Sequence, residues 1–325
     1  MKTSPLWRRL AALVLALGTS QAAFAADAFP SRPVRILVNT APGGLTDITT
    51  RLIAQQMGDT LKQSVIVENR AGGDGLIGIR AVKAAPADGY TLLATAGTIA
   101  LQMAVRAEPG YDLIKDFTGI GLMGRSPYLM VVAPTSSYKT LGEYVAAAKA
   151  TPAKVTYASA GVGTAVHLAT EQYMHQMGIK LMHVPYKGNG AAMPDVMAGR
   201  VEMILEAYGS SSGKIKGGQL RALGVTSSSR ISALPDVPTF AESGAPGYSY
   251  YTWLCIVAPA GTPKDVVAKL SDALRAATSS QAIKDRYRDD GMEAMNMTPD
   301  EFNRFLAREV TQAQKAVTEY GVQKQ

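Results

Sequence analysis

The sequence contains a single cysteine, Cys255, and only three histidines in 325 residues. One cysteine cannot form an intramolecular disulfide, so disulfides do not stabilise this fold. Cys255 lies in the apolar stretch 254–257, which favours a buried side chain, whereas reactive thiols prefer electropositive, partly exposed positions. His175 and His183 lack the spacing to another histidine or to cysteine that a zinc site needs. We therefore predict no metal and no cofactor.

Long apolar runs are equally scarce. The run at 10–17 follows three basic residues and is far shorter than the ~20 residues that span a bilayer as a helix. Small residues in an A-x-A pattern follow it, ending at Ala25. This order predicts a signal peptide over residues 1–25 and export to the periplasm. An uncleaved anchor is the alternative, which the clean cleavage pattern disfavours.

A concentrated charge of one sign is also lacking. Removing Lys2, Arg8 and Arg9 with the signal peptide lowers the formal charge from +7 to +4, because no acidic residue precedes Asp27. The remaining charges are dispersed, whereas a nucleic-acid-binding surface needs a concentrated basic stripe. We expect no nucleic-acid partner, and the mild positive charge favours anionic solutes only weakly.

What the sequence does contain is an alternation of short β-type runs and helical stretches, which is typical of an α/β fold with mainly parallel strands. The expected strands are 34–38, 64–67, 91–94, 129–132, 155–158, 181–184, 202–205 and 221–225. The expected helices include 46–57, 76–84 and 299–320. Thr140 and Thr298 each precede a glutamate by three residues, as in a capping box, and Thr262-Pro263 fits a cap followed by a first-turn proline.

About 300 mature residues exceed the usual size of one domain, so we expect two lobes. No flexible linker separates the halves, which indicates that strands near 119–124 and 249–257 cross between the lobes. We predict one lobe from residues 26–123 and 250–325, and the other from 124–249.

The first candidate site is the glycine-rich loop at 39–47, after the expected first strand. Gly43 and Gly44 allow close backbone approach to a ligand, and the N–H groups that open the following helix suit an anion. Asp47 either touches the ligand or caps the helix; an ordinary capped turn is the alternative. We favour a binding loop because ligands of open α/β sheets lie beyond the carboxyl ends of the strands.

A second loop, Ser159 to Thr164, has the same strand, glycine-rich turn and helix order, with Gly161 and Gly163 inside it. Two such loops in different halves are suited to close on one carboxylate. The rival interpretation is a periplasmic hydrolase that uses Ser159 or Ser210 with His167. Neither a G-x-S-x-G elbow nor an H-E-x-x-H motif occurs, so binding is favoured.

A third loop, 73–78, contains a literal G-x-G-x-x-G. A dinucleotide fold also needs an acidic residue at the end of the next strand, on the ribose. The expected strand 91–94 instead ends in Thr95-Ala96-Gly97, so we reject nucleotide binding.

A series of short segments then recurs through nearly the whole mature chain. They are Pro42-Gly43-Gly44 with Asp47 and Arg51, Val67 to Arg70, Ala85 to Leu93, Tyr157 to Leu168, His183 to Gly188, Leu220 to Leu223, Leu234 to Thr239, Pro246-Gly247-Tyr248 and Ala258 to Pro263. In order and completeness they resemble the solute-binding component of tripartite tricarboxylate transporters, the Bug or TctC family. One departure is an extra residue inside the usual P-D-G-Y, at 86–90.

The resemblance implies a non-catalytic protein with a two-lobed periplasmic-binding fold, each lobe a mainly parallel sheet flanked by helices, with the ligand in the cleft between them. It implies capture of a small organic carboxylate by backbone groups and waters at 40–47 and 159–164. It also implies a cleft lined by Ala96 and Thr98 and by Asn189 and Gly190. The implied partners are the membrane components of the transporter, and we expect a monomer.

The chain departs from the family at Glu206, Tyr208 and Tyr250-Tyr251, which we expect to face the distal end of the ligand. An ionised Glu206 repels a second carboxylate unless a cation or a shared proton intervenes. The alternative is that these side chains pack the junction of the lobes. The candidate ligand-binding residues are Gly43, Gly44, Asp47, Ala96, Thr98, Ser159, Gly161, Gly163, Thr164, Asn189, Gly190 and Glu206.

Overall fold

The computed structural model describes residues 29–322, so the predicted signal peptide at 1–25 lies outside the described part. From Arg32 onward the chain forms one compact unit, and the architecture below is that of this unit. Its strands are β1 (Val34–Val38), β2 (Val65–Asn69), β3 (Thr91–Ala96), β4 (Phe117–Val132), β5 (Thr156–Ser159), β6 (Met182–Pro185), β7 (Met203–Ala207), β8 (Arg221–Val225) and β9 (Tyr251–Pro259). Its helices are α2 (Leu45–Leu61), the 3-10 turn η1 (Gly73–Gly75), α3 (Leu76–Lys83), α4 (Thr98–Val105), α5 (Leu141–Ala150), α6 (Ala165–Met177), α7 (Asn189–Met197), α8 (Tyr208–Lys216), α9 (Lys264–Ser279), α10 (Gln281–Asp289) and α11 (Pro299–Glu319).

The strands follow the order β2-β1-β3-β9-β4-β7-β5-β6, and β8 pairs with β4. At one end β1 is parallel to β2 and β3, and at the other β5 is parallel to β6 and β7. The protein therefore has two mainly parallel sheets, each built from strand–helix units, which is the predicted α/β class.

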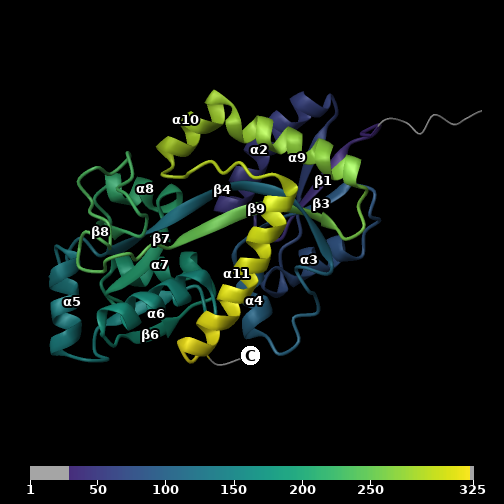
Figure 1. Ribbon diagram of the computed structural model, residues 1–325. Coiled ribbons are helices and arrows are strands. Elements are labelled where there is room, and N and C mark those ends of the chain that lie inside the picture. The colour runs from purple at the N-terminus through teal and green to yellow at the C-terminus, as the bar shows by residue number, and fades with distance from the viewer. Residues whose placement is uncertain (1–28, 323–325) are drawn as a thin grey trace, which may run out of the picture. The chain divides into compact units, whose positions relative to one another are not determined.

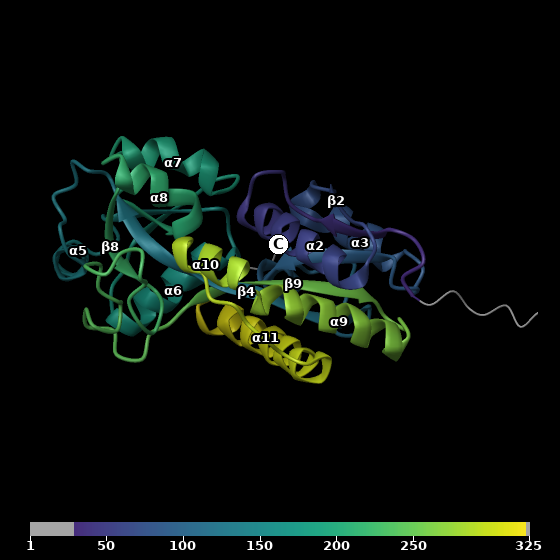
Figure 2. The ribbon, with the colours of Figure 1, turned by 90° about the horizontal axis from the view of Figure 1, so that it is seen from above.

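Two antiparallel strands join these sheets. β4 pairs with β9 from Phe117 to Pro127, and with β7 from Tyr128 onward. Figure 1 shows β4 and β9 side by side, with α5 to α8 gathered at one end of the pair and α2, α3 and α9 at the other. The view from above in Figure 2 shows the same division. The result is a two-lobed fold in which the chain passes between lobes within strands.

Glycines let helices approach the crossing strand β4 closely. A side chain at Gly119 would meet Phe302 of α11 at 2.6 Å, and one at Gly124 would meet the Tyr287 ring of α10 at 2.9 Å. The Tyr287 hydroxyl also donates to the Met123 carbonyl at 3.0 Å. Helices that follow β9 in the chain thus pack on the strand that enters the other lobe.

Cys255 lies on β9 and is fully buried, as the apolar sequence around it predicted. Burial raises the pKa of its thiol, which keeps the sulfur protonated. Between residues 29 and 322, no helix combines the length and the apolar character that a membrane crossing requires.

Candidate functional site

In the described chain, six helices follow the carboxyl ends of parallel strands: α2 after β1, α3 after β2 through η1, α4 after β3, α6 after β5, α7 after β6 and α8 after β7. Two close approaches connect the lobes at this edge. A Cβ at Gly163, just ahead of α6, would lie 2.8 Å from the side chain of Val105, the last residue of α4. One at Gly209, in the first turn of α8, would lie 3.9 Å from Leu45 of α2. The positive ends of the α2 and α8 dipoles therefore lie close together where the lobes face each other.

The β1–α2 loop is held by the Asp47 carboxylate. Only 3 % of Asp47 is exposed, and it accepts hydrogen bonds from Gly43 N at 2.9 Å, from Arg51 Nε at 3.1 Å and from Asn69 Nδ2 at 2.9 Å. These donors hold the pKa of this carboxyl below its ordinary value, although burial opposes them. All the observed bonds of Asp47 are internal, so its visible role is to shape the loop.

Gly44 precedes the helix in an extended conformation and provides no side-chain cap. The first helical bond is donated by Ile48 to the Gly44 carbonyl. Within residues 29–322, the N–H groups of Leu45 and Thr46 donate to no protein acceptor. The start of α2 thus presents unused N–H donors of the kind that suit an anion.

The β5–α6 loop is organised around the Ser159 hydroxyl, which is completely buried. Ser159 Oγ accepts from Gly161 N at 3.0 Å and lies 2.6 Å from His183 Nε2. The Gly161 carbonyl accepts from Thr164 Oγ1 at 2.7 Å and from Thr164 N at 3.3 Å. The Gly161 N–H and the Ser159 hydroxyl are therefore both used in internal hydrogen bonds that hold the loop.

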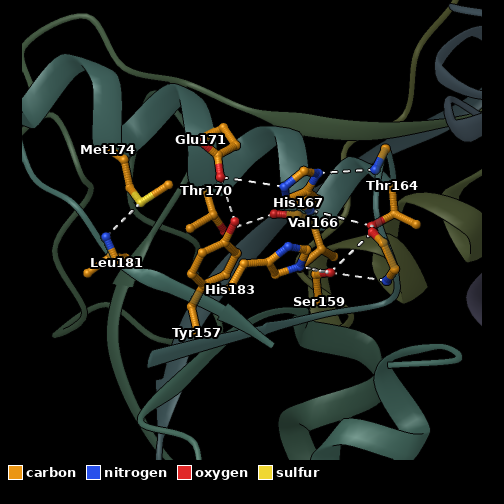
Figure 3. Close-up of polar contacts among 12 residues, drawn as sticks. Tyr157, Ser159, Thr164, Val166, His167, Thr170, Glu171, Met174, Leu181 and His183 are labelled. Carbon is orange, nitrogen blue, oxygen red and sulfur yellow. Dashed lines mark hydrogen bonds and ion pairs between the residues drawn. The ribbon is translucent and has the colours of Figure 1, made fainter. Parts of the chain in front are cut away.

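His167 holds the other side of this loop. Its Nδ1 accepts from Gly163 N at 3.1 Å, and its Nε2 lies 3.5 Å from Glu171 Oε1 (Figure 3). Tyr157 donates to the same Glu171 oxygen at 2.6 Å. An Nδ1 that accepts a backbone N–H is unprotonated, so the ring proton of a neutral His167 is on Nε2. In the described part of the chain, the N–H groups of Ala165 and Val166, which open α6, meet no protein acceptor.

The starts of α7 and α8 are tied together by Glu206 on β7. Its carboxylate accepts from Asn189 Nδ2 at 2.8 Å, from Ala207 N at 3.0 Å and from Ser210 Oγ at 2.5 Å. Only 7 % of Glu206 is exposed, and burial raises the pKa of its carboxyl despite these donors. Asn189 Oδ1, by contrast, is buried without a protein partner among the described residues.

The carboxyl ends of β1 and β3 carry further unpaired polar atoms. Asn39 Oδ1, Thr40 Oγ1 and Thr95 Oγ1 are buried and lack a protein partner in the described chain. Buried polar groups are normally hydrogen-bonded, so the two hydroxyls suit water or ligand oxygens, whereas Asn39 Oδ1, which only accepts, suits a donor such as water. Ala96 ends β3 opposite Leu254, and Thr98 opens α4.

Of the distal residues, Tyr208 is 1 % exposed and lies against Gly291, where a Cβ would approach its ring to 3.3 Å. The Arg125 guanidinium lies 4.0 Å from the centre of the Tyr251 ring, and the Tyr251 hydroxyl accepts from Ser228 N. These contacts favour packing for Tyr208 and Tyr251, which was the alternative interpretation of both residues.

A separate cavity of about 490 Å³ lies between β4, β9, α4, α6 and α11. Tyr250 and Trp253 contribute to its wall, and the predicted ligand-binding residues do not. Its lining includes Glu309, whose carboxylate accepts from Trp253 Nε1 at 2.6 Å and whose pKa is raised by burial. The lining also includes Arg125, Lys315 and Ala165, the first residue of α6. Residues 29–322 contain no group of three or more acidic, histidine or cysteine side chains arranged to hold a metal.

The sequence singled out neither His183 nor the Thr95 hydroxyl as part of a site, and Asn39 and Thr40 were included only as members of the loop at 39–47. His183 lies opposite Tyr157 in the parallel β5–β6 pair, and this register brings it to Ser159. Aligning the two expected strands by their glycine-rich ends would have revealed the proximity.

Two α/β lobes joined by paired strands, each with an open helix start beyond the carboxyl end of a parallel strand, define a solute-binding receptor of the periplasmic-binding type. The chain belongs to the tripartite tricarboxylate transporter family of receptors (TctC), whose family model matches residues 49–322. BugT of Bordetella pertussis is 33% identical over 318 residues, covering 97% of this chain and 98% of BugT.

Three solved structures extend the comparison. The periplasmic binding protein BugD superposes with a TM-score of 0.81 at 32% identity, covering 91% of this chain and 100% of BugD. R. palustris Rpa4515 with adipate has a TM-score of 0.83 at 30% identity, covering 91% and 99%. MatC of Rhodopseudomonas palustris with bound malate has a TM-score of 0.78 at 28% identity, covering 89% and 100%. The homologues and fold neighbours of the present chain are solute-binding receptors and not enzymes.

Proposed function

We propose that the protein captures a small organic carboxylate between the starts of α2 and α6 and delivers it to the membrane components of a tripartite transporter. The observation that carries the proposal is the pair of open helix starts, one from each lobe, with N–H groups that no described acceptor uses. An anion is stabilised at such an end by these donors and by the helix dipole. Neighbours of this fold hold adipate and malate, which are both dicarboxylates.

The predicted site residues take three roles in this proposal. Gly43 and Gly44 leave the α2 start open, while Gly161, Gly163 and Thr164 shape the α6 start. Asp47 and Ser159 hold their loops from inside. The residues that face the rest of the ligand are Ala96, Thr98, Asn189, Gly190 and, through its bond to Asn189, Glu206.

A panel of acids tests binding. Malate, adipate, citrate, glutamate, nicotinate and terephthalate are each added to purified protein, and the unfolding free energy is measured. A ligand that binds only the folded state stabilises it by about 2.7 kcal/mol at one hundred times its dissociation constant. If no acid stabilises the protein, the proposed function is wrong. Mass analysis after incubation separates binding from the rival hydrolase activity, because a receptor returns the acid unchanged.

Gly44→Val localises the site. Gly44 has a φ of −80°, and a Cβ there would lie 3.7 Å from the Ala41 carbonyl, so valine fits the fold. It should nevertheless cover the N–H groups at the start of α2 and abolish binding. Gly213→Val, at an exposed position in α8 with open space around it, is the matched control. Retained affinity in a folded Gly44→Val protein would count against this loop.

The finer assignments also belong to the proposal. The signal peptide at 1–25 predicts that the periplasmic protein begins at or within a residue or two of Ala26, which amino-terminal sequencing checks; a full-length cytoplasmic product would refute it. The lobe division at 26–123 with 250–325, and 124–249, is supported by the change of β4 partner near Tyr128. Light scattering of the purified protein tests the expected monomer.

A further inference from the structure

The Ser159–His183 contact is not explained by general packing. Ser159 lies in the loop that opens α6, and His183 lies on the neighbouring strand β6, with 2.6 Å between Oγ and Nε2 (Figure 3). A serine–histidine pair suggests a nucleophile and its base. Here the hydroxyl is fully buried and its oxygen also accepts the Gly161 N–H, so it is placed to hold the loop and not to attack a ligand.

The Ser159 hydroxyl donates to His183, because the other acceptor within its reach, the Gly161 carbonyl, is already occupied. Ser159 Oγ also lies 3.1 Å from the Gly161 carbonyl, the only alternative acceptor seen for it within the described residues. That carbonyl already receives two donors from Thr164. A carbonyl oxygen has two lone pairs, so the Ser159 proton goes to His183 Nε2. The ring proton of His183 is then on Nδ1.

The surroundings keep His183 in this neutral form. Its ring stacks on His167 at 4.3 Å and on Tyr157 at 4.7 Å between ring centres. Burial and the neighbouring His167 lower the pKa of His183 to about 4, while the Glu171 carboxylate opposes them. Tyr157 and Ser159 of β5 and His167 and Glu171 of α6 are the polar groups that face it.

We propose that His183 is a positioning residue for carboxylate binding: by accepting the Ser159 hydroxyl, it fixes the loop that sets the start of α6. The inference rests on the proposed function. Together with His167, which accepts Gly163 N, it forms a stacked pair that holds both glycine segments of the loop. Protonating His183 on Nε2 reverses the bond, because the ring then donates to Ser159 Oγ. The Ser159 proton turns to the Gly161 carbonyl and competes there with Thr164.

Two substitutions separate the ring from its hydrogen bond. His183→Phe keeps an aromatic ring between Tyr157 and His167 but accepts no proton, so affinity should fall about fivefold to tenfold, the order of one hydrogen bond. His183→Gln keeps an acceptor near the position of Nε2 without titrating, so affinity at neutral pH should stay within about twofold. His175→Gln is the matched control, because His175 is exposed on α6.

The pH profile distinguishes positioning from a general structural role. The dissociation constant is measured with the panel acid that stabilises the wild type most. The ratio of wild-type to His183→Gln affinity removes the titration of the acid itself. We expect this ratio to fall as the pH approaches about 4, where His183 becomes protonated. A ratio that is constant with pH, or unchanged affinity in His183→Phe, overturns the inference while the proposed function stands.

A ligand-free measurement completes the test. The chain has three histidines, so their ring nitrogens can be assigned in a nitrogen-15 spectrum from His167→Gln and His175→Gln. We expect His183 as the Nδ1–H tautomer, with an Nε2 resonance that shifts in Ser159→Ala. An Nε2–H tautomer at neutral pH refutes the assignment even if His183→Phe fails to fold. If no acid binds the wild type, the proposed function fails and this inference fails with it, whichever tautomer is found.

Discussion

Among single residues, Glu206 shows how a buried charge adds pH dependence to stability. Burial raises the pKa of its carboxyl above the unfolded value of 4.5, although Asn189, Ala207 and Ser210 donate to it. A raised pKa favours the neutral form in the folded protein. The contribution of Glu206 to stability is therefore fully present below the unfolded pKa and is lost as the pH rises through the folded pKa.

Glu206→Gln should remove this dependence. The amide can still accept from Ala207 N, and rotation of Asn189 brings its unpaired Oδ1 to the new donor. We expect the unfolding free energy of wild type minus variant to decrease from about pH 4 to about pH 8. Urea unfolding across that range measures it, with Glu108→Gln, an exposed loop position, as the control. Parallel curves for wild type and Glu206→Gln would contradict the prediction.

Helix ends show what a local pattern predicts at the scale of one element. The capping box at Thr298 and Glu301 is present in full. At Thr140 only half of the box forms, because the Glu143 carboxylate accepts from Lys139 N instead. The cap predicted at Thr262 is wrong. α9 begins at Lys264 with Pro263 in the cap position, and Thr262 Oγ1 donates to the Pro259 carbonyl.

Thr298→Ala should destabilise the protein by about 1 kcal/mol, the usual contribution of a threonine cap. α11 packs on both α4 and β4, so loosening its first turn weakens the joint between strand and helix. Thr311→Ala, in the exposed middle of the same helix, is the control, since alanine has the higher helix propensity there. Urea unfolding measures both variants. Equal midpoints for wild type and Thr298→Ala would show that the cap contributes nothing.

The strands show which element bounds the sequence predicts and which it does not. β1 and β8 have the predicted bounds, because their apolar residues lie between clear turn signals. β4 was predicted as two separate pieces, a crossing strand near 119–124 and a strand at 129–132, which the structure joins into one strand. Its first part contains Gly119, Gly121 and Gly124, and glycines weaken the local strand pattern. Those glycines make room for α9, α10 and α11, which follow more than 130 residues later in the chain. Nothing in the sequence near β4 indicates that these three helices pack on it.

At the scale of the whole molecule, contacts between distant segments of the chain also limit what the sequence predicts about the site. The helix starts were predictable, since glycine-rich loops after strands are local patterns. The Ser159–His183 bond is visible in neither segment alone, because it appears only when β5 and β6 are aligned in register. The contact between lobes at Gly163 and Val105 was hidden, since it joins the loop before α6 to the end of α4, a helix of the other lobe.

That contact gives a prediction about how the lobes come together on a ligand. Gly163 has a φ of +74°, and a Cβ there would lie 2.8 Å from both Val105 methyl groups. Gly163→Ala should therefore lower carboxylate affinity through backbone strain and through steric contact between the lobes. Val105→Ala removes only the steric part.

A double-mutant cycle with Gly163→Ala and Val105→Ala isolates that steric part. Residues in contact show coupling of about 0.5–3 kcal/mol, so the double variant should recover part of the affinity lost in Gly163→Ala. Calorimetric titration with the best acid of the panel measures all four proteins. The control is Gly161→Ala, which also has a positive φ but lies nearest the Tyr186 carbonyl at 3.4 Å, within its own lobe. Its loss should not respond to Val105→Ala, because strain alone causes it. Additive losses for Gly163 and Val105 would mean that this contact does not limit closure of the lobes.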